Sequence, residues 1–267
     1  MAEQKSPSGK LIVSGDGPVV RIMLNRPECH NALDREVSAE LNEAVRTVSV
    51  DRDCRVLVLT GAGNTFCAGD DVKEFNDWEP DDVQWQVRQY QQTVGILENL
   101  VPVTIAAVDG VCTGGGLELT LACDFVVATR RSRWGMPEIN WDITPGWGGT
   151  AKLAKFAGRR KAKEWNLLGS LFSAEKAERY DLVNRLCEPG ELESEVSTLI
   201  EILLAKSPTT LRCTKYYLDH GADLDLARSM IFEGAPPRHP FGQGVRDFVE
   251  RSTRDARRKL VEDFWFD

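Results

Sequence analysis

The prediction of a fold for this chain starts at the segment Ile105-Ala-Ala-Val-Asp-Gly-Val-Cys-Thr-Gly-Gly-Gly-Leu-Glu-Leu-Thr-Leu-Ala-Cys-Asp124. Residues 103–108 form a short apolar run that is typical of a buried strand, and Asp109-Gly110 is a turn signal. Three glycines, 114–116, then lead into an apolar helical run, 117–123. Because glycine has no Cβ, another group can approach this backbone closely. The first N–H groups of the helix lack partners inside it and suit an oxyanion.

A second segment repeats this arrangement upstream. Val56–Thr60 is again a short apolar run, followed by Gly61-Ala-Gly63 and by Cys67-Ala-Gly-Asp-Asp71. Two parallel strands that end in such loops place backbone donors in one crevice, which predicts an oxyanion hole. A run of glycines alone is more often a plain turn. The second strand with its Gly-containing loop is what favours an oxyanion site over a turn. A nucleotide loop is disfavoured because Gly-Lys-Ser/Thr and G-x-G-x-x-G are both absent.

Composition narrows the function classes. The chain has 267 residues and a formal net charge of −8, so bulk attraction to nucleic acid or to an anionic membrane is not expected. Seven cysteines occur singly and three histidines show no ligand spacing, which argues against a disulfide framework and a structural metal. The amino-terminal segment lacks the apolar core of a secretory signal, and no apolar run reaches transmembrane length. We therefore expect a cytoplasmic protein.

Strands and helices alternate in the first half of the chain. This order predicts an α/β fold with a parallel sheet and right-handed crossovers. After residue 128 helices dominate, apart from a loop at 134–149 that is rich in Gly, Pro and Trp. Loops of this length are usually functional. A boundary is predicted near Ser207-Pro208. Strands are expected at 19–24, 56–60, 103–108 and 125–128, and helices from Asp34, Asp81, Thr150, Arg159, Ser173, Leu192, Pro208 and Gln243.

Five motifs in this order resemble the crotonase (enoyl-CoA hydratase/isomerase) superfamily, over residues of about 19 to 190. The resemblance implies a crotonase-like ββα spiral core over 1–206. It also implies a C-terminal helical trimerisation region over 207–267, and a homotrimer or a dimer of trimers. The motifs are Leu24-Asn-Arg-Pro27 with Asn31-Ala-Leu33, Phe66-Cys-Ala-Gly-Asp-Asp71, Gly110 through Asp124, Gly135-Met-Pro-Glu138, and Pro145-Gly-Trp-Gly-Gly-Thr150.

The resemblance also implies an acyl-CoA thioester as substrate, with coenzyme A as part of the substrate and no separate cofactor. The backbone N–H groups of Ala68 and Gly115 would bind the thioester oxygen. Asp71 is more simply a local cap or ion-pair partner, and Asp124 is expected to be structural. Asp70 departs from the family pattern, in which small or apolar residues are usual. The acyl-CoA site would be lined by Ala68, Gly69, Asp70, Asp71, Gly115 and Trp141.

Two glutamates carry the predicted chemistry. In hydratases of this family one Glu follows the triple glycine and another follows Gly-x-Pro, and Glu118 and Glu138 match these positions. The resemblance therefore implies an enoyl-CoA hydratase, an activity of fatty acid metabolism. Glu118 lies near a positive helix end and is expected to ionise readily and to deprotonate water. Glu138 lies in a Trp-rich loop, so its pKa is expected to be raised and it would donate a proton.

Alternative activities remain open on the same fold. Trp141 within Ile-Asn-Trp is similar to the hydroxycinnamoyl-CoA hydratase-lyases, and an isomerase or a ring-opening hydrolase uses related groups. A non-catalytic acyl-CoA-binding or RNA-binding member is a further class, which the two glutamates and the acidic chain disfavour. Trp134, Trp141 and Trp147 either line the pocket or belong to the core. The segment from Gln243 departs from the family pattern, so we assign no adenine or phosphate contacts.

Overall fold

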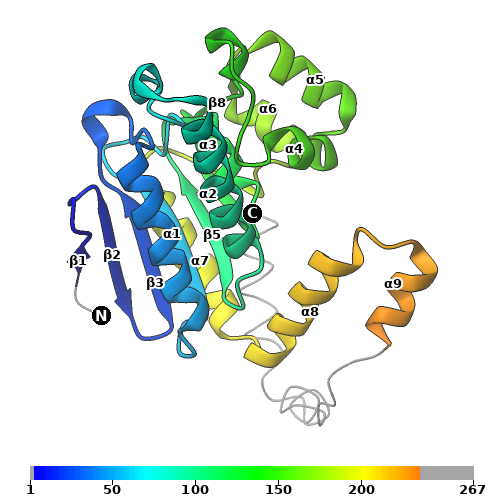
Figure 1. The fold of residues 1–267 in the computed structure, drawn as a ribbon. Helices are drawn as coiled ribbons and strands as arrows, with labels where there is room; N and C mark the ends of the chain where they lie inside the picture. The colour runs from blue at the N-terminus through cyan, green and yellow to red at the C-terminus, as the bar shows by residue number, and fades with distance from the viewer. Residues whose placement is uncertain (1–2, 235–267) are drawn as a thin grey trace, which may run out of the picture.

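The structure is a computed structural model, and it describes residues 3–234. Within that part of the chain, seven strands form one sheet in the order β1-β2-β3-β4-β5-β7-β10 (Figure 1). Each pair of neighbours from β3 to β10 in this order is parallel. In contrast, β1 pairs antiparallel with β2, and β2 pairs antiparallel with β3. The strands are β1 (Gln4–Lys5), β2 (Leu11–Asp16), β3 (Val19–Leu24), β4 (Val56–Gly61), β5 (Val103–Val108), β7 (Phe125–Thr129) and β10 (Arg185–Cys187).

A small second sheet lies beside the carboxyl ends of the central strands. Its order is β6-β8-β9, with β6 (Val111–Thr113), β8 (Arg133–Gly135) and β9 (Phe172–Ser173). Because β6 directly follows β5, this sheet carries the chain from the end of the buried strand into the triple glycine. The predicted α/β class is confirmed.

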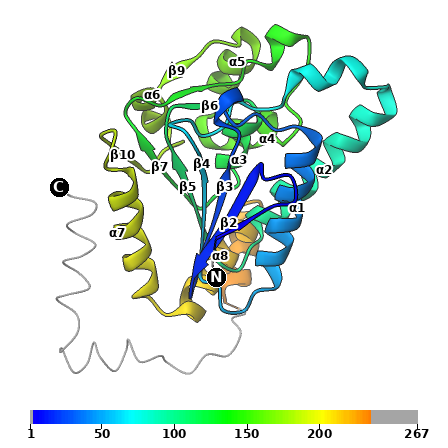
Figure 2. The ribbon, with the colours of Figure 1, turned by 90° about the vertical axis from the view of Figure 1, so that its left-hand side faces the viewer.

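Helices cover both faces of the central sheet. Figure 2 shows α7 (Leu192–Leu204) on one face and α1 (Arg35–Val50) with α2 (Pro80–Glu98) on the other. In Figure 1, α8 and α9 extend to one side of the sheet, and Lys215 of α8 donates to the carbonyl of Pro102, just before β5. The remaining helical segments are η1 (Pro27–Cys29), η2 (Val72–Asp77), α3 (Gly115–Thr120), η3 (Glu138–Trp141), α4 (Gly149–Ala157), α5 (Arg159–Leu168), α6 (Ala174–Arg179), α8 (Pro208–Gly221) and α9 (Leu226–Glu233).

Side-chain caps fix several predicted helix starts. Asp34, Ser173 and Ser207 each accept a hydrogen bond from the backbone N–H three residues further on, at the starts of α1, α6 and α8. The strand predictions also hold, since β3 and β5 have the predicted bounds and β4 and β7 are each one residue longer. The helix expected from Gln243 lies outside the described residues. None of the helices within 3–234 combines the length and apolarity needed to cross a membrane.

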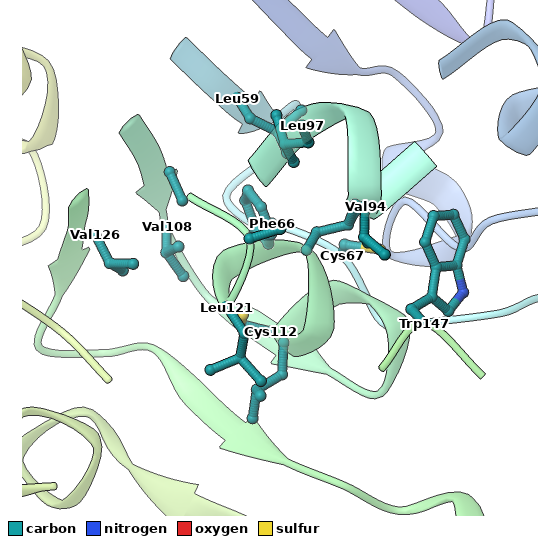
Figure 3. Packing of buried hydrophobic residues seen from close by; sticks show 14 of the residues in the cluster. Leu59, Phe66, Cys67, Val94, Leu97, Val108, Cys112, Leu121, Val126 and Trp147 are labelled. Atoms are coloured by element: carbon teal, nitrogen blue, oxygen red, sulfur yellow. The ribbon is translucent and has the colours of Figure 1, made fainter. Parts of the chain in front are cut away.

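The larger core cluster packs beneath the triple glycine. Figure 3 shows Phe66, Cys67 and Cys112 within it, and all three are fully buried. A Cβ built on Gly116 would lie 2.3 Å from the carbonyl oxygen of Cys67. Only glycine therefore lets α3 sit against the loop after β4, which is the close approach that the sequence predicts.

Candidate active site

The loops that follow β4 and β5 are joined to each other by backbone hydrogen bonds. The N–H groups of Phe66 and Cys67 both donate to the carbonyl of Val111, at 3.0 and 2.9 Å, and Thr113 N–H donates to Cys67 at 3.0 Å. The two Gly-containing loops thus lie side by side at the carboxyl ends of the parallel strands. This is where ligands bind in sheets of this type.

Asn31 holds the first of these loops, a role that its place in a motif did not reveal. The side chain is 1% exposed, and its Nδ2 donates to the carbonyls of Ala62, Thr65 and Phe66 at 2.9–3.1 Å. Its Oδ1 accepts from Arg26 N–H at 2.8 Å. One buried amide side chain therefore fixes the backbone that leads into residues 67–71. Only the non-local geometry shows this, because the bonded carbonyls lie 31 to 35 residues away.

The structure corrects one predicted oxyanion donor. Ala68 N–H already donates to the carbonyl of His30 at 2.9 Å, so it is not available to a ligand. Within residues 3–234, by contrast, the N–H groups of Asp70 and Gly115 have no hydrogen-bond partner. Gly69 lies between them with φ +96°, and a Cβ there would lie 3.1 Å from Gly115 N. Glycine at 69 therefore leaves the Gly115 N–H uncovered, and Asp70 replaces Ala68 as the candidate donor.

Glu118 is buried and anchored by backbone donors. It is 1% exposed, and its Oε1 accepts from Trp147 N–H at 2.9 Å and from Gly149 N–H at 2.6 Å. A Cβ on Gly149 would lie 2.8 Å from the same oxygen, so the loop needs glycine there. Burial raises the pKa of Glu118 to about 8, and the charge of Glu138 adds to this shift. The expectation that Glu118 ionises readily is therefore wrong, because burial outweighs the helix end.

Glu138 is also buried, but no residue within 3–234 anchors its carboxyl group. It is 8% exposed, and neither of its side-chain oxygens has a hydrogen-bond partner in the described part of the chain. A Cβ on Gly114 would lie 3.3 Å from its Oε1, which places this carboxyl beside the triple glycine. Burial raises the pKa of Glu138 to about 7, as the sequence predicts. A buried carboxyl without partners is a costly arrangement that points to a functional role.

The two aspartates after Gly69 have different surroundings. Asp71 caps η2 by accepting from Lys73 N–H, and it forms an ion pair with Arg26 at 3.1 Å. The local role predicted for Asp71 is confirmed. Asp70 accepts from the indole Nε1–H of Trp147 at 3.0 Å, and burial raises its pKa to about 6. Asp70 is thus a third carboxyl at the site.

The three tryptophans of the 134–149 loop divide between core and surface. Trp134 and Trp147 are fully buried and belong to the core cluster. Trp141 is 59% exposed, because η3 turns this side chain outward, and its contact with substrate stays a prediction. Glu138, at the start of η3, is turned inward.

Asp124 has the structural role that the sequence predicts. Its Oδ2 accepts from Thr104 N–H at 2.7 Å and from Lys215 Nζ at 2.7 Å. The carboxylate therefore ties β5 to α8 rather than facing the glutamates. No group of three or more His, Cys, Asp or Glu side chains within 3–234 is arranged to hold a metal ion.

Known proteins resemble this chain over most of its length. A family model described as enoyl-CoA hydratase/isomerase matches residues 15–256. The crotonyl-CoA hydratase of Syntrophomonas wolfei is 31% identical over 224 residues, which cover 84% of this chain and 86% of that protein.

Solved structures give the same result. The enoyl-CoA hydratase from Bacillus anthracis has 32% sequence identity and a TM-score of 0.85, covering 91% of this chain and 97% of that chain. A protein from Thermobifida fusca YX, solved in complex with acetoacetyl-CoA, has 27% identity and a TM-score of 0.79 and covers 90% and 95% of the two chains.

Proposed function

Because the chain belongs to the enoyl-CoA hydratase/isomerase family, we propose that it adds water across the 2,3-double bond of an acyl-CoA thioester. The observation that carries the proposal is a pair of buried carboxyls, Glu118 and Glu138, beside two unpaired backbone donors. Hydration needs a base for water and an acid for carbon. An isomerase that moves one proton within its substrate needs one such group.

The thioester oxygen binds to the N–H groups of Asp70 and Gly115. As water adds to Cβ, the electron pair of the double bond moves toward Cα and negative charge builds on this oxygen. Donors that are already fixed in place stabilise this charge without reorganisation. Gly115 is the first residue of α3, where the helix end adds a favourable partial charge.

Glu118 takes the proton of the attacking water, and Glu138 gives a proton to Cα. Two backbone N–H groups fix the direction of Glu118, which suits a group that must orient water. The unpartnered Glu138 carboxyl has its hydrogen-bonding capacity free for the substrate. Their pKa values of about 8 and about 7 lie near neutral pH, where the pair holds one proton. The reactive form, with Glu118 ionised and the proton on Glu138, is the less populated arrangement of that proton. The reaction leaves the proton on Glu118 instead of Glu138, and exchange with solvent restores the pair.

This mechanism needs no separate organic cofactor, because the coenzyme A group is part of the substrate. The acetoacetyl-CoA complex of the Thermobifida fusca relative supports a thioester in this site. Gly69 and Asp70 line the acyl-CoA site beside the two donors, next to Ala68 and Asp71. The acyl specificity is tested separately, by substitution of Trp141.

Assembly into a trimer, or a dimer of trimers, is part of the proposal. Several apolar side chains on α8 and α9 are half or more exposed, which supports burial against other copies of the chain. They are Tyr216, Leu218, Leu226, Met230 and Ile231. In this scheme residues 207–267 form the oligomerisation region and 1–206 the core. Sedimentation of the full chain at micromolar concentration tests it, and a stable monomer contradicts it.

A product assay tests the proposed activity against its competitors. The chain is incubated with crotonyl-CoA and, separately, with a cinnamoyl-type CoA thioester. A 3-hydroxyacyl-CoA product supports hydration. A shifted double bond indicates an isomerase, release of an aldehyde a hydratase-lyase, and the absence of any turnover a non-catalytic binder. If Trp141 contacts the acyl group, Trp141→Ala changes the ratio of the two rates, whereas an equal loss on both leaves it outside the pocket.

A further inference from the structure

Trp147 contacts three of the residues that the proposed function uses. Its backbone N–H donates to Glu118 Oε1 at 2.9 Å, and its indole Nε1–H donates to Asp70 Oδ1 at 3.0 Å. A Cβ built on Gly115 would lie 3.0 Å from the same indole nitrogen. The side chain is fully buried, and Figure 3 shows it at the border of the core cluster, close to Cys67 and Val94.

Packing against α2 fixes the orientation of the indole. The ring stacks on Tyr90, with the ring centroids 4.1 Å apart and the planes 12° from parallel. Gly146 also lies against this helix, since a Cβ built on it would make ordinary van der Waals contact with Tyr90 and Val87, at 3.5 Å from each. The Nε1–H edge of the indole is therefore held toward Asp70.

Asp70 is held at both its side chain and its backbone. The Tyr90 hydroxyl also stabilises the ionised carboxylate. On the backbone, Leu33 N–H donates to Gly69 at 2.8 Å and Asp71 N–H donates to Leu33 at 2.9 Å, so the peptide units on either side of Asp70 are fixed. The N–H of Asp70 itself has no partner in the part of the chain that the structure describes, and it is one of the two proposed oxyanion donors.

We infer that Asp70 and Trp147 form a positioning pair, whose indole–carboxylate hydrogen bond sets the Asp70 N–H relative to Gly115 and Glu118. This inference rests on the proposed function. The alternative is that the bond only satisfies two buried polar groups, as most buried polar groups require. The two readings differ in kinetics, because a displacement of about 1 Å at a reacting group lowers the rate by up to roughly 10²-fold.

Three substitutions isolate the bond. Trp147→Phe removes the indole donor but keeps an aromatic ring against Tyr90 and the backbone N–H to Glu118. Asp70→Ala removes the acceptor, whereas Asp70→Asn keeps an acceptor oxygen and removes the charge. Trp134→Phe is the matched control, since Trp134 is equally buried and its Nε1–H donates at 2.8 Å to Ser132 Oγ.

The positioning pair predicts a specific kinetic pattern with an enoyl-CoA substrate. Trp147→Phe and Asp70→Ala each lower kcat by about 10-fold while KM changes little. The double variant loses no more than either single variant, because both remove the same bond. Asp70→Asn retains most of kcat. Trp134→Phe lowers Tm by an amount similar to that for Trp147→Phe and leaves kcat unchanged.

The pH profile separates the charge of Asp70 from its bond to Trp147. The Asp70 charge raises the pKa values of Glu118 and Glu138. Asp70→Asn and Asp70→Ala therefore shift the kcat profile to lower pH, and Trp147→Phe, which keeps the carboxyl, does not produce that shift. Asp70→Asn also covers the case in which Asp70→Ala fails to fold.

The inference is overturned if Trp147→Phe loses no more kcat than Trp134→Phe, or if the losses of Trp147→Phe and Asp70→Ala multiply in the double variant. A wild-type chain that hydrates no enoyl-CoA contradicts the proposed function instead, and that outcome is separate from a wild-type enzyme whose variants behave normally.

Discussion

The segment that carries Glu118 and the segment that carries Glu138 hold the same chemical group in different ways. Glu118 lies within α3, and a distant loop supplies two backbone donors to one of its oxygens. Glu138 begins η3 and has no partner for either oxygen among residues 3–234. The first carboxyl is fixed by the protein, and the second keeps its hydrogen-bonding capacity for a ligand. The difference is what assigns orientation of water to Glu118 and protonation of carbon to Glu138.

The largest expected effect comes from removing either carboxyl. Glu118→Gln and Glu138→Gln each eliminate one half of the proton transfer, and each should lower kcat by roughly 10²–10⁴-fold with little change in substrate binding. Steady-state kinetics with crotonyl-CoA measure both. A normal rate for Glu118→Gln together with an inactive Glu138→Gln would break the comparison, since one carboxyl would then suffice and the enzyme would be an isomerase or a lyase.

A smaller but still large effect is expected at the site that the two glutamates share. Gly115→Pro removes one proposed oxyanion donor, and proline is tolerated at the first position of a helix. Turnover should fall by roughly 10²-fold or more. Circular dichroism and Tm serve as controls for folding, because a Cβ at this position approaches the Trp147 indole. A folded variant with wild-type turnover places the oxyanion site elsewhere.

Ala68 and Asp70 show why the sequence predicts only part of this site. Apolar runs and glycines predict where strands end and where backbones approach closely, so both loops could be placed. The direction of an individual N–H depends on backbone rotation, and the left-handed conformation of Gly69 decides that Asp70, not Ala68, has the unpaired donor. No side-chain pattern encodes that rotation.

The sequence mispredicts the pKa of Glu118 for a similar reason. The sequence shows its place near a helix start, which favours ionisation. The opposing effects arise only in the folded chain, where burial of the carboxyl and the charge of Glu138 outweigh the Gly149 and Trp147 N–H bonds that favour ionisation. The outward orientation of Trp141 also depends on tertiary packing, because η3 places Glu138 inside and Trp141 outside.

A moderate effect is expected in the pH profile. The pair works with one proton, so kcat/KM should fall below about pH 7, where both carboxyls are protonated, and above about pH 8, where both are ionised. Because the Glu138 charge raises the pKa of Glu118, Glu138→Gln should lower it. Titration of Glu118 by carbon-13 NMR in wild type and Glu138→Gln measures the shift. An unchanged Glu118 pKa would show that the two carboxyls do not interact.

The smallest expected effect is on stability. The pKa of Glu118 is raised from 4.5 to about 8, so the folded state binds its proton more tightly and the free energy of unfolding falls as pH rises through that window. Glu118→Gln has no carboxyl to ionise at this position, so it does not lose this part of the free energy of unfolding. Its Tm should therefore exceed that of wild type clearly at about pH 8.5, and the difference should shrink as the pH falls toward about 4.5. Exposed Glu43→Gln is the control, and the same gain at both pH values would contradict the burial argument.

Isotope incorporation tests hydration itself most directly. Crotonyl-CoA is incubated with the wild-type chain in ¹⁸O-labelled water and, separately, in deuterium oxide, and the thioester product is analysed by mass spectrometry and NMR. We predict one oxygen from water on Cβ and one deuteron on Cα in an intact 3-hydroxyacyl-CoA. Deuterium without oxygen incorporation, or cleavage of the thioester or of the carbon chain, would contradict the account.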